Sequence, residues 1–186
     1  SASYDKTVKL WLLNNDGSHG QCTATLKGHG DTVRSVAFHP ISHLLATGSD
    51  DGTAKLWVVK NDGSEATCTA TLKGHSNYIY SVAFHPILPL LATGSYDSTA
   101  KLWLLNSDGT EVTCTATLTD HTKCVSTVAF HPRLPFFATG SHDSTAKLWL
   151  LNGDGTECTC TATLDGHASS IWSLAFHPTA PLLATG

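Results

Sequence analysis

Short runs of alternating apolar and polar residues, separated by turn-forming residues, make up most of this chain. Residues 33–38 read Val-Arg-Ser-Val-Ala-Phe, and similar runs cover residues 44–48, 53–59 and 67–72. Turn-forming residues interrupt them at 39–43, 49–52 and 61–64. Alternation over five to seven residues predicts β-strands, and the 3.6-residue spacing of an amphipathic helix is absent. We therefore predict an all-β protein built from short antiparallel strands.

The same pattern recurs four times at a spacing of 46 residues, without an insertion. The triplet Lys-Leu-Trp stands at residues 9–11, 55–57, 101–103 and 147–149, and Phe-His-Pro at 38–40, 84–86, 130–132 and 176–178. A repeat of about 40 to 45 residues with four strands is typical of a propeller blade, which cannot bury both of its faces alone. The spacing predicts complete units at about 27–72, 73–118 and 119–164, with partial units at 1–26 and 165–186.

The residues within each unit resemble the WD-repeat β-propeller family. They run Gly-His, then Ser-Val-Ala-Phe-His-Pro, then Leu-Leu-Ala-Thr-Gly-Ser-x-Asp-x-Thr-x-Lys-Leu-Trp. One departure is the loss of the Asp that follows Trp in the family, replaced here by Leu12, Val58, Leu104 and Leu150. The resemblance covers the whole chain and implies blades of four strands.

The resemblance also implies a buried chain of hydrogen bonds in each blade, from Trp to Thr, then to His, then to Asp. Mapped onto this sequence, three sets are contiguous: Trp57, Thr47, His29 and Asp51; Trp103, Thr93, His75 and Asp97; Trp149, Thr139, His121 and Asp143. Such a network is tolerated only when every member is paired, because an unpaired buried polar group costs about 1–3 kcal/mol. We expect a structural role for these residues.

The fourth set is divided between the two ends of the chain. Asp5 and Trp11 lie near the first residue, whereas His167 and Thr185 lie near the last. Unpaired sheet edges invite association, so each half blade should find a partner. We predict a homodimer in which two chains of four blade equivalents close an eight-bladed ring and complete each other's split blades. A four-bladed ring within one chain, and a piece of a longer array, are the alternatives.

Differences between the four copies cluster at positions that, by the resemblance, lie on the top surface of a propeller. First-strand positions carry Thr32 and Arg34, Tyr78 and Tyr80, Cys124 and Ser126, Ser170 and Trp172; the position before the turn Asp carries Tyr4, Asp50, Tyr96 and His142. Tyr, Trp and Arg are common binding anchors. We predict a partner-binding surface made of Arg34, Tyr78, Tyr80, Tyr96, His142 and Trp172, with drift of solvent-facing loops as the alternative.

The composition of the chain restricts the kinds of partner that we expect it to bind. The formal net charge of −4, from 11 basic and 15 acidic residues, lacks the basic patch of a nucleic-acid binder. No apolar run reaches the roughly 18 residues that span a bilayer, so we expect no membrane partner and a soluble protein. Six cysteines in no metal or disulfide pattern favour a reducing, cytoplasmic setting. The lack of Met suggests an excised, processed or designed chain.

Sequence leaves three interpretations of function. The first is a non-enzymatic scaffold for a protein or peptide, without metal or cofactor. The second is a lectin-like propeller with repeated aromatic pockets, and the third is a designed or excised fragment without an evolved partner.

The grouping of Thr47, His29 and Asp51 imitates a hydrolase triad but recurs in every unit. We expect His39, His85, His131 and His177 to fill turns rather than to share a metal, and Asn106-Ser107-Asp108-Gly109 to form a β-turn rather than a calcium loop.

Overall fold

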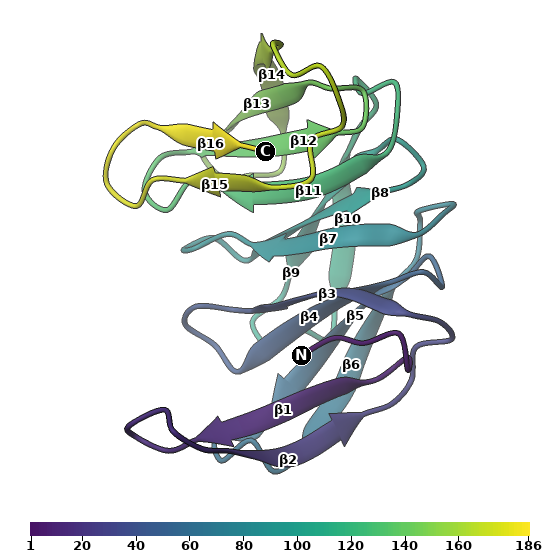
Figure 1. The fold of residues 1–186 in the computed structure, drawn as a ribbon, viewed down its shortest axis with the longest axis vertical. Helices are drawn as coiled ribbons and strands as arrows, with labels where there is room; N and C mark the ends of the chain where they lie inside the picture. The colour runs from purple at the N-terminus through teal and green to yellow at the C-terminus, as the bar shows by residue number, and fades with distance from the viewer.

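The computed structural model describes residues 1–186 as sixteen β-strands in five antiparallel sheets (Figure 1). No helix is long and apolar enough to cross a bilayer. The all-β prediction is confirmed, and the predicted strand limits differ from the observed ones by one residue at most. Leu44–Ser49 and Ala66–Leu72 each gain one residue, and Ala54–Val59 loses one.

Three sheets have four strands each, joined in chain order as in propeller blades. The first contains β3 (Val33–Phe38), β4 (Leu44–Ser49), β5 (Ala54–Val59) and β6 (Ala66–Leu72). The second contains β7 (Ile79–Phe84), β8 (Leu90–Ser95), β9 (Ala100–Leu105) and β10 (Val112–Leu118). The third contains β11 (Val125–Phe130), β12 (Phe136–Ser141), β13 (Ala146–Leu151) and β14 (Cys158–Leu164).

The core lies between neighbouring sheets. Leu56 of one sheet belongs to the same buried cluster as Ile79 and Val82 of the next. A glycine on β4 allows the sheets to approach closely: a Cβ at Gly48 would lie 2.7 Å from Ile79 Cγ2. Gly94 and Gly140 meet the same constraint, with built Cβ atoms 2.9 Å from Val125 and 2.8 Å from Ile171. Each blade therefore depends on its neighbour for burial.

The remaining strands form two half blades at opposite ends of the stack (Figure 1). They consist of β1 (Val8–Leu13) paired with β2 (Gly20–Leu26), and β15 (Leu174–Phe176) paired with β16 (Leu183–Thr185). The pairing of β1 with β2 repeats that of β5 with β6, including the irregularity before Trp11 and Trp57. The stack is open, so the single chain does not form the four-bladed ring.

Candidate functional site

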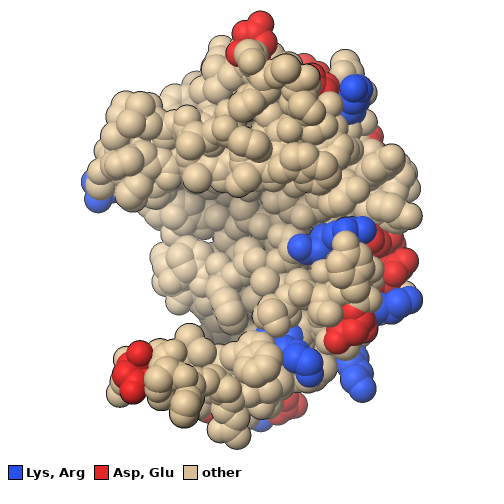
Figure 2. All heavy atoms as spheres, viewed as in Figure 1, with Lys and Arg blue, Asp and Glu red and all other residues tan.

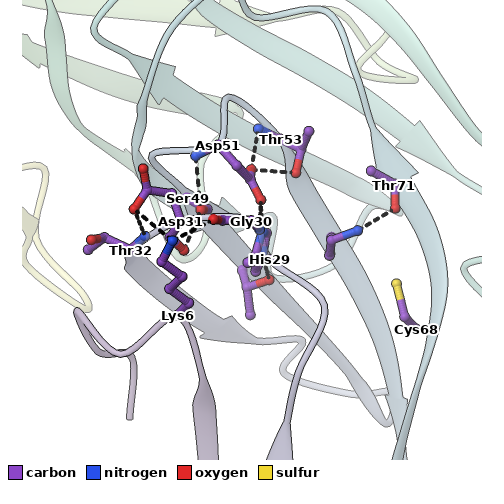
Figure 3. A network of polar contacts seen from close by, with 12 residues as sticks. Lys6, His29, Gly30, Asp31, Thr32, Ser49, Asp51, Thr53, Cys68 and Thr71 are labelled. Atoms are coloured by element: carbon purple, nitrogen blue, oxygen red, sulfur yellow. Dashed lines mark hydrogen bonds and ion pairs between the residues drawn. The ribbon is translucent and has the colours of Figure 1, made fainter.

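A buried hydrogen-bond network crosses the first complete sheet (Figure 3). The indole N–H of Trp57 donates to Thr47 Oγ1 at 3.0 Å. His29 Nε2 lies 2.6 Å from the same hydroxyl, and His29 Nδ1 lies 2.8 Å from Asp51 Oδ2. Because a carboxylate only accepts, His29 carries its proton on Nδ1 and Nε2 accepts from Thr47. Every polar group along the chain from Trp57 to Asp51 is thus paired.

The other complete sheets contain the same network. His75 lies 2.8 Å from Asp97 and 2.7 Å from Thr93, which accepts from Trp103 at 2.9 Å. In the third sheet the corresponding distances are 2.8 Å for His121 to Asp143, 2.7 Å for His121 to Thr139 and 3.0 Å for Trp149 to Thr139. The structure therefore brings together all twelve residues of the three contiguous sets.

Burial and hydrogen bonding shift the pKa values of the Asp and His residues of the network in opposite directions. Desolvation acts to raise the pKa of Asp51, but hydrogen bonds from Thr53, Gly30 and His29 outweigh it and lower this pKa to about 2. The pKa values of Asp97 and Asp143 are lowered in the same way. Desolvation lowers the pKa of His29 and His121, against the raising effect of their Asp partners. At neutral pH each Asp is charged, and His29 and His121 are neutral.

This grouping cannot work as a hydrolase triad. Thr47 is completely buried, and its hydroxyl both accepts from Trp57 and donates to His29. A nucleophile needs access to a substrate carbonyl, which a hydroxyl enclosed by an indole and an imidazole lacks.

The fourth set is not brought together within the chain. His167 Nε2 lies 2.6 Å from Thr185 Oγ1, while Asp5 Oδ1 accepts from the backbone and hydroxyl of Thr7. Trp11 donates instead to Ser1 Oγ, at 3.3 Å. The expected contact of Trp11 with Thr185 is therefore absent inside one chain, because the half blades lie at opposite ends of the stack.

The six candidate binding residues form one continuous row across the blades. Arg34 lies with its guanidinium carbon 5.6 Å from the ring centre of Tyr80. Tyr80 in turn lies 6.1 Å from Tyr96 and 6.3 Å from His142, between ring centres. The row continues from Tyr96 to Tyr78 at 5.9 Å and from His142 to Trp172 at 4.2 Å. Tyr4 extends it beyond Arg34, at 5.2 Å.

The row carries little net charge. Two nitrogens of the Arg34 guanidinium, Nε and the terminal Nη2, donate to the two carboxylate oxygens of Asp50, at 2.8 and 2.6 Å. This pairing raises the pKa of Arg34 further above its usual value. Desolvation raises the pKa of Tyr80, so its hydroxyl stays protonated. Figure 2 shows most of the charged side chains of the visible face on its right, where both signs are interspersed, and a few isolated ones at the top and on the left.

Three of the variable positions are not solvent-facing, contrary to expectation. Thr32, Cys124 and Ser126 are buried. Ser126 Oγ lies within hydrogen-bonding distance of the carbonyl oxygens of Gly140 and Ile171, so its hydroxyl links its own blade to the next. Small side chains at these positions pack inside the structure, so only part of the variation lies on the surface.

The Phe-His-Pro segments make a contact that sequence reasoning missed. His39 Nδ1 accepts from the backbone N–H groups of Ile41 and Ser42, which fixes the turn. The ring of His39 also packs edge-on against Phe84 of the next blade, at 5.0 Å. His85 meets Phe130 and His131 meets Phe176 in the same way, each at 5.1 Å. The exact 46-residue recurrence of Phe-His was the available signal for this contact.

The turn at residues 106–109 is closed by the N–H of Gly109 donating to the Asn106 carbonyl at 3.2 Å. Asp108 Oδ1 accepts from the backbone and hydroxyl of Thr110, so its carboxylate stabilises the turn. No group of three or more His, Cys, Asp or Glu side chains is placed to hold a metal ion.

Two equivalent depressions lie between the turns of neighbouring blades. One, of about 200 Å³, is lined by residues such as His39, Ile87 and Leu105. The other, of about 440 Å³, is lined by their counterparts His85 and Leu151. Neither is lined by Phe, Tyr or Trp, on which a sugar ring would stack. These two repeated depressions therefore lack the aromatic lining that the lectin-like interpretation expects.

Comparison with known families gives four matches along the chain. The model of the WD40 family, described as "WD domain, G-beta repeat", matches residues 20–58, 66–103, 112–149 and 158–186. These matches together include well over half of the sequence. The first three each reach the third strand of one blade, as in Leu-Trp at 56–57, and the fourth includes β14, β15 and β16.

Curated relatives are similar over single repeats. The "Nuclear distribution protein nudF 2" of Penicillium rubens is 46% identical over 50 residues, which cover 27% of this chain and 10% of the relative. The "Lissencephaly-1 homolog" of Dictyostelium discoideum is 42% identical over 50 residues, covering 27% of this chain and 11% of the relative. The similarity thus spans about a tenth of the length of these relatives.

Proposed function

This chain belongs to the WD40 family, and we propose that it is a non-enzymatic scaffold that binds a protein or peptide partner through its top face. The proposed surface is the row of Arg34, Tyr78, Tyr80, Tyr96, His142 and Trp172. The continuity of this row across four successive blade units is the observation that carries the proposal.

The chemistry of the row suits protein recognition. Tyr and Trp present large rigid faces with one polar group each, which gives contact area at little cost in side-chain entropy. Tyr78, Tyr96 and Trp172 are exposed, although they are large and apolar. Scattered exposed apolar residues need no explanation, but a contiguous row of them is typical of an interaction site.

Selection from a displayed peptide library tests this proposal. Peptides selected on the wild-type chain should bind the Tyr80→Ala/Trp172→Ala double variant at least about tenfold more weakly, the loss expected from removing anchors of 1–2 kcal/mol. The matched control is Ile41→Ala/Ile87→Ala, which removes two exposed side chains from the opposite turns. Undiminished binding to the double variant would exclude the row as the binding surface.

We also propose that the chain binds a second copy of itself and closes an eight-bladed ring. The half blades support this proposal, since β15 pairs with β16 in the same register as β3 with β4. Native mass spectrometry of a mixture of ¹⁵N-labelled and unlabelled chains should give a mixed dimer. A mixture that yields only single chains at micromolar concentration would rule the ring out.

A further inference from the structure

The larger of the two depressions between the turns of neighbouring blades differs in charge from its equivalent. It lies between the connection from β7 to β8 and the connection from β11 to β12, which project from the same side of the stack, on the left in Figure 1. Arg133 is the one Lys, Arg, Asp or Glu residue that lines it, and the smaller depression is lined by none. In a chain with a formal net charge of −4, this depression is therefore a local exception.

The guanidinium of Arg133 has no acidic partner within the chain. Arg133 is exposed, and none of the ion pairs of the chain includes it. The other arginine, Arg34, is instead paired with Asp50. Asp154, which follows the lining residues directly, accepts from the N–H and hydroxyl of Thr156. A guanidinium offers two parallel N–H donors to a carboxylate, so that of Arg133 is free to bind an external one.

Folding of the turn does not require an arginine at this position. The same position of the repeat holds Ile41, Ile87 and Thr179 in the other units. In all four turns the imidazole Nδ1 of the Phe-His-Pro segment accepts from the same backbone N–H groups, two and three residues further on. The side chain of Arg133 is therefore not needed for the turn.

A second unpaired donor lies in the wall of the depression. His131 lines it and is 4% exposed. Its Nδ1 accepts from the N–H groups of Arg133 and Leu134, at 3.1 and 3.0 Å, so its proton is on Nε2. That Nε2 is buried and has no acceptor in the chain. The ring packs edge-on against Phe176, but an aromatic ring is a weaker acceptor than an oxygen atom. An oxygen supplied by a ligand would satisfy this donor.

The rest of the lining is largely apolar. Ile87, Leu88, Leu134 and Pro135 contribute to it, and Ile87 and Leu134 are 70% and 40% exposed. The volume of about 440 Å³ falls within the range of roughly 300–1,000 Å³ that is usual for ligand sites. A ligand that suits both parts of the lining therefore carries a carboxylate and an apolar group close together.

We infer that this depression binds the carboxyl-terminal residue of a partner polypeptide, and that this residue has an apolar side chain. Its carboxylate pairs with Arg133, its side chain packs against Ile87 and Leu134, and His131 supplies a donor to one of its oxygens. A terminal apolar residue carries the charge and the apolar group on one Cα, whereas an internal Asp or Glu needs a neighbour for the apolar contact. The depression lies on the side opposite to the proposed row of binding residues, so this inference does not rest on the proposed function.

Fluorescence polarisation with synthetic peptides tests this inference. The probes are labelled at the amino end, consist of a short Gly-Ser stretch that ends in Leu, Ile, Val or Phe, and are made both as the free acid and as the carboxyl amide. At least one free acid should bind, and its amide should bind at least about tenfold more weakly, because the amide has no charge to pair with Arg133. Arg133→Ile should weaken binding of the free acid by the same factor and leave binding of the amide unchanged.

Two variants act as controls for Arg133→Ile. This substitution introduces the side chain that Ile41 and Ile87 place in the equivalent turns, so the urea midpoint should match that of the wild type. Lys73→Ile removes an exposed positive charge outside the depression and should bind the probes as the wild type does. Arg133→Lys keeps the charge without the two parallel donors, so it should lose less binding than Arg133→Ile.

Three results would overturn the inference. They are a lack of binding of every free acid at about 1 mM protein, equal binding of acid and amide, and undiminished binding to Arg133→Ile. A free carboxylic acid with the side chain of the tightest peptide is used as a competitor. If it competes as strongly as the peptide, the ligand is a small acid and the assignment to a polypeptide is wrong. Tyr80→Ala/Trp172→Ala should bind these probes as the wild type does, so failure at the row and failure at this depression are seen separately.

Discussion

The complete blade formed by β7 to β10 and the half blade formed by β1 and β2 have nearly the same sequence but very different burial. Trp103 is 3% exposed in the complete blade, and its counterpart Trp11 is 50% exposed. Phe84 is 8% exposed, because His39 of the preceding blade packs on it, whereas Phe38 of β3, which lines the groove beside the half blade, is 61% exposed. Identical local sequence thus produces the same strand pairing in both places, but only a neighbour on each side produces a core.

Replacing Trp103 or Trp11 with Ala tests this difference in burial, and the first of the two should give the largest effect. Trp103→Ala should lower the free energy of unfolding by about 3–5 kcal/mol, since it leaves a cavity and removes the indole N–H that donates to Thr93. Trp11→Ala should cost less than about 1 kcal/mol in the dilute single chain, because half of the side chain is already exposed.

Urea denaturation followed by circular dichroism measures both variants. The matched pair makes each variant the control of the other. Equal losses in dilute solution would mean that the half blade is as tightly packed as a complete one, contrary to the comparison.

The Thr hydroxyl of the network gives the next largest effect. Thr93→Val keeps the shape of the side chain but leaves the indole N–H of Trp103 and His75 Nε2 without their shared partner. We expect a loss of about 2–3 kcal/mol. Thr185→Val should cost about 1 kcal/mol or less, because the His167 to Thr185 bond is exposed. A shift in urea midpoint as large for Thr185→Val as for Thr93→Val would contradict this.

Much of the fold was readable from the sequence because the repeat constrains it. Alternation located the strands, and the recurring Trp, Thr, His and Asp located the networks through the family resemblance. Packing between blades was harder to predict from the sequence. The burial of Cys124 and Ser126 depends on where the next blade places its backbone, and no local pattern reports that distance.

The same limit applies to the candidate surface. Sequence comparison of the four copies selected the residues of the row, but the pairing of Arg34 with Asp50 required coordinates. The bond from Trp11 to Ser1 was also missed, because the expected partner of Trp11 was Thr185, although Ser1 stands one repeat of 46 residues before Thr47.

The free energy of unfolding should fall in two stages as the pH is lowered, and the groups responsible lie mainly in the complete blades. The pKa values of His29 and His121 are lowered in the fold, so the unfolded chain binds protons first, and stability falls as the pH drops through about 6.5. The lowered pKa of Asp51, about 2, means that its contribution is present above about 4 and is lost between about 4 and 2.

Urea midpoints at pH 7.5, 5.5 and 3 check both stages. In Asp51→Asn the loss of stability between pH 5.5 and 3 should be smaller than in the wild type. If the wild-type midpoint is the same at pH 7.5 and 5.5, the stage assigned to His29 and His121 is refuted. Asp5→Asn is the matched control in the half blade, and it should alter the profile little.

The smallest effect is expected at the exposed phenylalanine. Phe38→Ala should change the unfolding free energy of the dilute chain by no more than about 0.5 kcal/mol, whereas Phe84→Ala should cost about 3 kcal/mol or more. Thermal unfolding at low protein concentration compares the two. A substantial loss for Phe38→Ala in the single chain would show that something within the chain covers this side chain.

Light scattering coupled to size-exclusion chromatography, repeated over a range of concentrations, tests most directly whether the half blades are completed by a second copy. We predict a mass that rises with concentration to twice that of the chain and then stays constant, since a closed two-fold ring has no edge left for a third copy. A mass that remains that of one chain, or one that keeps growing past two, would contradict the account.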